Sequence, residues 1–180
     1  GLNGSTSSVF YQLYNGATAA TSLIGTGSTL DFGLQTTAGT YSVVATNTST
    51  TCSRAMTGTT AVGINPLPAV YAVTGGGSYC SGSAGVSVGL SGSNSGINYR
   101  LYNGSSVVGA PVTGTGSALN FGIFTAPGTY TVLATNTSTS CTNDASGSAT
   151  VVMNSLPTAY TVLGGGSYCA GDAGLLVRLS

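Results

Sequence analysis

Residues 128–136 read Gly-Thr-Tyr-Thr-Val-Leu-Ala-Thr-Asn, and residues 39–47 read Gly-Thr-Tyr-Ser-Val-Val-Ala-Thr-Asn. In both stretches a tyrosine, a valine and an alanine occupy alternate positions. An apolar residue at every second position predicts a β-strand with one buried face. The two stretches begin at residues 39 and 128, an offset of 89. The same stretch therefore indicates both a β fold and an internal repeat.

The repetition extends over the whole chain. Residues 14–16 (Tyr-Asn-Gly) return as residues 102–104 at an offset of 88, and one extra residue near 107–111 makes the later offset 89. Both ends of the chain fall inside a repeat, so we expect a window on a longer array. This period is longer than the roughly 20–50 residues of solenoid repeats and matches one small β-sandwich domain.

The chain carries very little charge. Only 3% of its residues are charged, 41% are hydrophobic, and His and Trp are absent, whereas soluble domains average about 25% charged residues. Near-zero net charge removes the attraction that nucleic-acid binding requires, and it removes the repulsion between copies. No apolar run reaches the roughly 20 residues of a membrane span. We expect no nucleic-acid partner, no membrane span in this segment, and close association with other copies.

The middle repeat predicts a sandwich of about seven strands, separated by Gly, Ser and Asn turns. The expected strands are 70–74, 86–90, 97–102, 107–112, 118–121, 129–135 and 149–154. The Gly-rich runs at 75–77 and 164–166 are expected to permit a kink or a close backbone approach. Proline-containing segments at 65–68 and 154–157 predict domain junctions. We therefore expect three domains: 1–65, lacking its first strand or strands; 66–154, complete; and 155–180, holding the opening strands of the next repeat.

Two tyrosines have a predicted structural role. Tyr41 and Tyr130 each follow a Gly-Thr pair at the start of the alternating stretch. This arrangement resembles the start of an immunoglobulin-type F strand, where a tyrosine hydroxyl ties a strand corner. A plain core aromatic is the alternative, and in either case both tyrosines are structural.

Several motifs occur in order along the chain. They are Gly-Gly-Gly-Ser-Tyr-Cys at 75–80 and 164–169, Tyr-Arg-Leu-Tyr-Asn-Gly at 99–104, the strand at 128–136, and a late Cys141. Over the entire chain these motifs resemble the tandem immunoglobulin-like repeats of giant Bacteroidetes cell-surface adhesin and filament proteins, which are associated with type IX secretion. The resemblance implies an all-β fold of tandem immunoglobulin-like β-sandwiches, arranged as a rod or filament at the cell surface or outside the cell.

The four cysteines, two per repeat, are disulfide candidates. No His and no Cys-x-x-Cys spacing accompanies them, so disulfides are favoured over metal ligation. Three pairings stay open: Cys80 with Cys141 inside the complete domain, bonds between successive domains, and Cys52 with Cys80 together with Cys141 with Cys169.

Four Asn-x-Ser/Thr sequons are candidate glycosylation sites, although a chain so rich in Ser and Thr produces such matches by chance. They begin at Asn3, Asn47, Asn103 and Asn136. No catalytic, cofactor-binding or metal residues are expected, since the few Asp and Arg occupy non-equivalent positions and no His or Lys can activate a hydroxyl.

Two classes of function remain. The first is a structural repeat unit of an extracellular filament or adhesin stalk. In it, residues 155–180 complete the 1–65 sandwich of the next copy, by chain continuity or by strand donation. The alternative is a carbohydrate-binding or adhesive module whose exposed tyrosines stack on sugars. Its candidate tyrosines are Tyr14, Tyr79, Tyr102 and Tyr168.

Overall fold

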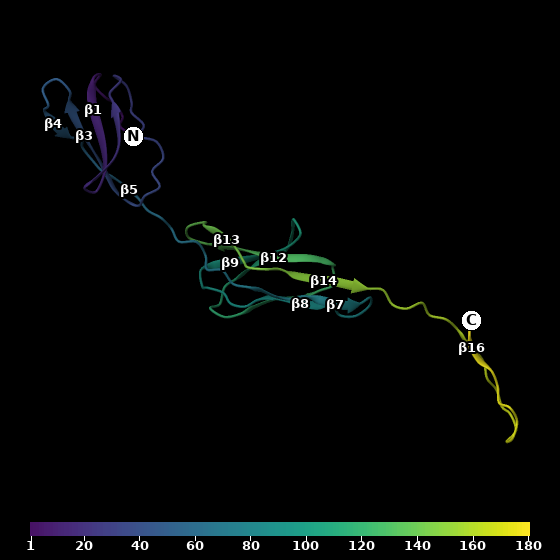
Figure 1. Ribbon diagram of the computed structural model, residues 1–180. Helices are drawn as coiled ribbons and strands as arrows, with labels where there is room; N and C mark the ends of the chain where they lie inside the picture. Colours follow the sequence, from purple (N-terminus) through teal and green to yellow (C-terminus); the bar gives the residue numbers. More distant parts are fainter. The chain divides into compact units, whose positions relative to one another are not determined.

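The computed structural model describes residues 1–180, and every regular element in it is a β-strand, which confirms the all-β prediction (Figure 1). The chain divides into two compact units, Gly1–Pro66 and Leu67–Ser180. The division falls within the first proline segment. No helix in the structure is long and apolar enough to cross a membrane.

Unit 2 holds two sheets between Leu67 and Asn154. Its strands are β6 (Val73–Gly75), β7 (Gly77–Cys80), β8 (Val86–Leu90), β9 (Ile97–Asn103), β10 (Ser106–Thr113), β11 (Leu119–Phe124), β12 (Gly128–Asn136), β13 (Thr142–Asp144) and β14 (Ala149–Asn154). The six-stranded sheet has the order β10-β9-β12-β14-β7, with β13 beside β12, and the three-stranded sheet has the order β11-β8-β6. All neighbours are antiparallel except β14 and β7, which are parallel.

One apolar core joins the two sheets of unit 2. Tyr130, Val132 and Ala134 of β12 are 1–2% exposed, as the alternation predicts. Val88 and Leu90 of β8, in the other sheet, belong to the same buried cluster. Figure 1 shows β8 facing the sheet that contains β12 and β14. Two sheets around one core are consistent with a β-sandwich.

The hydroxyls of Tyr130 and Tyr41 each hydrogen-bond to the backbone just before the strand in which the tyrosine lies. The hydroxyl of Tyr130 donates a hydrogen bond to the carbonyl of Ala126 at 2.8 Å, and that of Tyr41 donates to Thr37 at 2.8 Å. Both side chains are buried. Burial raises the pKa of Tyr130, while a hydrogen bond with Asn103 opposes this shift.

Unit 1 contains only one sheet. Its strands are β1 (Val9–Asn15), β2 (Thr18–Ile24), β3 (Gly39–Asn47), β4 (Ser53–Ala55) and β5 (Thr60–Val62). They are the counterparts, 88 or 89 positions earlier, of β9, β10, β12, β13 and β14, and Gly39 pairs with Val62 as Gly128 pairs with Val151. Of the second sheet, unit 1 keeps a single bridge between Leu2 and Leu30.

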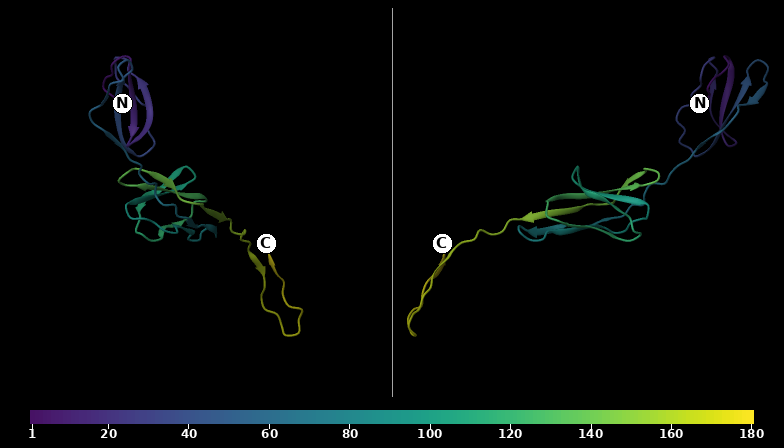
Figure 2. Two further views of the ribbon diagram at one scale, coloured as in Figure 1. Left: turned by 60° about the vertical axis from the view of Figure 1, so that its left-hand side comes forward. Right: turned by 180° about the vertical axis from the view of Figure 1, so that it is seen from behind.

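The end of the chain forms an isolated hairpin of β15 (Val162–Gly164) and β16 (Val177–Leu179), seen in yellow in Figure 2. Val162 pairs with Leu179 in the register in which Val73 pairs with Leu90. Every residue from 152 to 180 is exposed. The hairpin therefore reproduces β6 and β8 without their neighbours.

The strand predictions were wrong in detail near the triple glycine. The predicted strand at 70–74 is reduced to β6, and β7 and β13 were not predicted. β7 begins directly after Gly75 and Gly76, whose φ angles of +88° and +81° favour glycine. A Cβ on Gly76 would lie 2.7 Å from the carbonyl oxygen of Thr150. The predicted close backbone approach is thus confirmed for the run at 75–77.

Replacing Tyr130 by Phe removes the hydrogen bond to Ala126. We expect the free energy of unfolding of unit 2 to fall by about 1 kcal/mol at neutral pH. Since the folded pKa lies above the unfolded one, the contribution of Tyr130 is complete below the unfolded pKa of 10.0 and declines as pH rises beyond it. Denaturant unfolding at neutral pH and at about pH 11 measures both effects. Equal stabilities of the two proteins at neutral pH would contradict the structural role.

Candidate assembly interface

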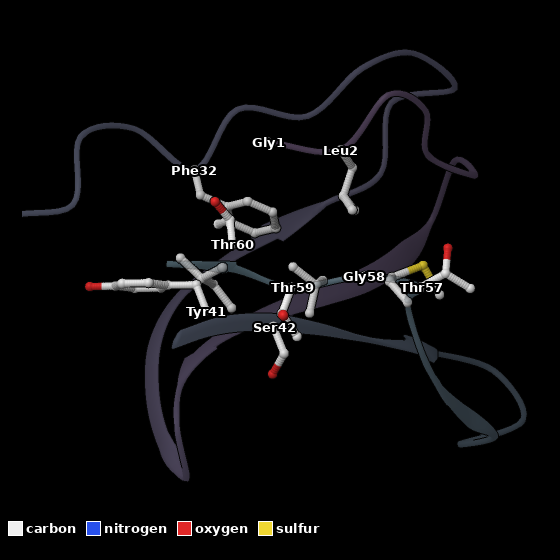
Figure 3. A pocket seen from close by; sticks show the side chains of 12 residues that line it. Gly1, Leu2, Phe32, Tyr41, Ser42, Thr57, Gly58, Thr59 and Thr60 are labelled. Atoms are coloured by element: carbon white, nitrogen blue, oxygen red, sulfur yellow. The ribbon is translucent and has the colours of Figure 1, made fainter. Parts of the chain in front are cut away.

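Unit 1 contains a cavity of about 210 Å³ at the edge of its core. Leu2 and Phe32 lie on one side of it, and Tyr41 and Thr59 lie on the other (Figure 3). The complete lining is Gly1, Leu2, Leu13, Phe32, Tyr41, Ser42, Val43, Met56, Thr57, Gly58, Thr59 and Thr60.

In unit 2 the corresponding space is occupied by β6 and the residues before it. The N–H of Val73 donates to the carbonyl of Ser146 at 2.9 Å, and the N–H of Ser146 donates to the carbonyl of Tyr71 at 2.9 Å. The counterpart of Ser146 in unit 1 is Thr57, which lines the cavity. The cavity therefore lies where unit 2 holds its first strand.

Unit 1 has fewer regular strands around this cavity. Residues 30–35 correspond to β11 but form no strand, and β5 ends at Val62 while β14 continues beside β7. Leu34 is 99% exposed and Ile64 is 69% exposed. These segments lack the regular backbone pairing that their counterparts make with β8 and β7.

The hairpin of β15 and β16 presents the side chains that the core of unit 1 lacks. Val177 is 64% exposed, whereas its counterpart Val88 is 0% exposed. Tyr168 is 60% exposed, whereas Tyr79 is 8% exposed. The N–H of Gly165 donates to the carbonyl of Leu176 at 3.1 Å, as Gly76 donates to Ser87 at 2.8 Å. The hairpin thus has its backbone preformed and its apolar face uncovered.

In this structure Cys52, Cys80, Cys141 and Cys169 form no disulfide with one another, and bonds between successive copies stay a prediction. The pairing of Cys80 with Cys141 is wrong for a geometric reason. Cys80 pairs with Asn154 beyond the Gly128 end of β12, and Cys141 bonds to Asn136 at the other end. Eight strand steps of roughly 3.3 Å separate these ends, while a disulfide needs Cα atoms about 4.4–6.8 Å apart.

The tyrosines expected to stack on sugars do not share one exposure. Tyr79 is a core residue whose hydroxyl donates to the carbonyl of Thr125, so its predicted exposure was wrong. Tyr14 and Tyr102 are half-buried on β1 and β9, and Tyr168 is exposed on the hairpin. The burial of Tyr79 disfavours the sugar-binding alternative.

The candidate glycosylation sites differ in their surroundings. Asn47 and Asn136 each accept backbone N–H groups through Oδ1, and their Nδ2 groups make no hydrogen bond within the protein. The Nδ2 of Asn103 donates to the carbonyl of Pro127 at 3.2 Å. Asn3 is exposed. Asn103 is therefore the least suited of the four to modification at that nitrogen.

The cavity of unit 1 was missed by sequence reasoning, although the residues that fill the equivalent space of unit 2 recur at 160–177. A scan against protein-family models and a search of curated proteins found no match to this chain. The features that point to a function are therefore unit 1, which has only one sheet, and the hairpin of β15 and β16, which has no sheet to pack against.

Leu13 and Leu101 are a matched pair that measures the incompleteness of unit 1. Leu101 lies in a closed core, so Leu101→Ala should cost about 3 kcal/mol. Leu13 lines the cavity and already lacks neighbours on one side, so Leu13→Ala should cost the monomer about 1 kcal/mol less. Denaturant unfolding at low protein concentration tests this, and equal losses would show that the core of unit 1 is closed.

Proposed function

We propose that the protein is a structural repeat unit of an extracellular or cell-surface filament or adhesin stalk. Its domains are immunoglobulin-like and assemble head to tail, with residues 155–180 of one copy completing the 1–65 domain of the next. One observation carries the proposal: the hairpin repeats the register of β6 and β8, and unit 1 has a cavity where unit 2 holds the first of them, β6.

The energetics of burial support this assembly. Fully burying one large aliphatic or aromatic side chain contributes about 1.5–3 kcal/mol. The hairpin exposes Tyr160, Tyr168, Leu175 and Val177, at 47–64% of their surface. Because these four are only about half exposed, burying them contributes about 3–7 kcal/mol. Together with new strand pairing, this is comparable to the lower part of the roughly 4–15 kcal/mol cost of associating two chains.

The charge of the chain supports the same conclusion. Proteins that must stay apart protect exposed strand edges with charged residues, most often Lys. This chain has three Lys or Arg in 180 residues. β5, beside the cavity, is Thr-Ala-Val and β15 is Val-Leu-Gly. Such uncharged edges expose a monomeric protein to aggregation, and they suit a protein that pairs with its own copies.

The family resemblance supports a location at the cell surface or outside the cell. It rests on the ordered motifs at 75–80, 99–104 and 128–136. A surface solvated by hydroxyls and amides rather than charges is compatible with lateral packing or with a glycan coat. The partners we propose are copies of the protein itself.

Removing the hairpin tests the proposal. The full chain should form oligomers whose length grows with protein concentration, visible as filaments by electron microscopy, because each copy offers both a cavity and a hairpin. A chain that ends at Thr158 keeps the cavity and unit 2 but should sediment as a monomer. Filaments of unchanged length from the shortened chain would exclude the hairpin as the connecting element.

A further inference from the structure

We propose that the cavity of unit 1 is a docking site for residues 160–177 of a second copy, held in one register by two glycines, Gly4 of the acceptor and Gly165 of the donor. This inference rests on the proposed function and specifies its contact. The contacts proposed between the two copies are those seen within unit 2, formed by the counterpart residues 88 or 89 positions away.

The first step is strand pairing. In unit 2, β7 runs parallel to β14, with Val151 opposite Gly77 and Asn154 opposite Cys80. The same register places donor residues 166–169 beside acceptor residues 62–65. The acceptor segment now ends its strand at Val62, so docking would extend β5 toward Asn65.

The second step concerns Gly4. Its counterpart Gly92 lies under the ring of Tyr71, where an added Cβ would be 2.5 Å from the ring. Around Gly4 nothing lies within 4 Å of an added Cβ. The counterpart of Tyr71 is Tyr160, which is 63% exposed on the donor segment. Docking would place the ring of Tyr160 on Gly4.

The third step concerns Gly165. Its counterpart Gly76 passes so close to β14 that an added Cβ would meet the oxygen of Thr150 at 2.7 Å. In the hairpin, nothing lies within 4 Å of a Cβ added to Gly165. The free hairpin has room for a side chain there, and the docked hairpin would not, because the backbone of Ala61 would take the place of Thr150.

The fourth step sets where the donor ends. Residues 178–180 and residues 1–3 both correspond to residues 89–91, so they compete for one place. Gly1 already fills it, and a Cβ there would lie 2.5 Å from the carbonyl oxygen of Leu30. Arg178 carries a Cβ and does not fit. The completed strand would therefore consist of the donor through Val177, followed by Gly1 and Leu2 of the acceptor.

The direction in which the chain runs through unit 2 indicates a second copy as the occupant of the cavity. The side chain of Asn143 holds the carbonyl of Pro68 at 2.9 Å, so the chain enters at the β13 end. It leaves after Asn154, at the opposite end of β12. Entry and exit at opposite ends give a contact between unlike surfaces, which adds copies in an open series.

Two full-length variants test the docking together. Gly4→Leu blocks the acceptor, since the side chain has room in free unit 1 but occupies the place of Tyr160. Gly165→Ala blocks the donor. By sedimentation velocity each variant alone should remain a monomer where the unmodified chain forms oligomers. Their equimolar mixture should form a heterodimer and nothing longer, because it contains one intact cavity and one intact hairpin.

The matched controls are two other glycines. Gly16→Ala changes an open glycine of unit 1 in the turn between β1 and β2, with no neighbour within 4 Å, and it lies outside both the cavity lining and residues 62–65. Gly96→Ala carries the same kind of positive-φ strain as Gly165→Ala, at +78° against +80°, and it lies in a turn of unit 2 with no neighbour within 4 Å, outside the cavity and outside residues 160–177. Both controls should form oligomers as the unmodified chain does.

The outcomes separate the two proposals. Filaments from Gly4→Leu or Gly165→Ala alone would overturn this docking site but leave a filament function that uses another contact. Folded, monomeric variants that give no heterodimer would also overturn the site. An unmodified chain that stays monomeric at all concentrations would overturn the proposed function, and docking to a second copy with it.

Tyr168 gives a graded test of the same register. The hydroxyl of its counterpart Tyr79 donates to the carbonyl of Thr125, so the docked Tyr168 would donate to the carbonyl of Thr36. Tyr168→Phe keeps the ring and should raise the dissociation constant between copies about tenfold. The stability of the monomer should not change, since this side chain is exposed. An unchanged dissociation constant would contradict the register.

Discussion

The fold depends on hydrogen bonding between the beginning and the end of each repeat. In unit 2, β7 pairs with β14, and the backbone around Val73 bonds to Ser146. β7 and β14 are separated by some 70 residues of sequence. β14 is nevertheless the only strand that pairs with β7, and β7 is the only strand that pairs with β14 on the side away from β12. In unit 1 no strand lies beside β5 in the place that β7 takes beside β14, and residues 166–169, the counterpart of β7, form no strand. Unpaired backbone groups at an apolar edge favour association.

The apolar core likewise needs strands from both sheets. The half contributed by β9 and β12 is closed only when β8 covers it, and Leu101 and Val132 are then 2% exposed. Without that cover, Leu13 and Val43 remain more accessible and a cavity opens beside them. Close packing in a β-sandwich requires both sheets, since each sheet buries one face against the other. The remaining sheet of unit 1 is sufficient to form a cluster around Tyr41, but not to close it.

Local patterns predicted much of this architecture, and long-range pairing accounts for what they missed. The alternation through Tyr130 and the glycine turns placed most strands within a few residues. β7 escaped because Gly-Ser-Tyr-Cys has one inward apolar residue, Tyr79, and forms a strand only beside β14. The exposure predicted for Tyr79 failed for the same reason. The Cys80–Cys141 pairing was left open among three, although the topology of a sandwich already places these cysteines at opposite ends of the domain, as the structure shows. The cavity could be inferred only after the two units were compared residue by residue.

A chain with so few charges must specify its pairing register by shape. Salt bridges and like-charge repulsion, the usual means of excluding a slipped strand, are not available to a protein with six charged residues placed at non-equivalent positions. Close backbone contacts at glycine can replace them, because a slip by one residue would put a side chain where only hydrogen fits and would also turn Val177 away from the core. Gly76 and Gly92 have this role inside unit 2. Their counterparts in the hairpin and in unit 1 face open space, which is the arrangement expected if the same contacts form between copies rather than within one.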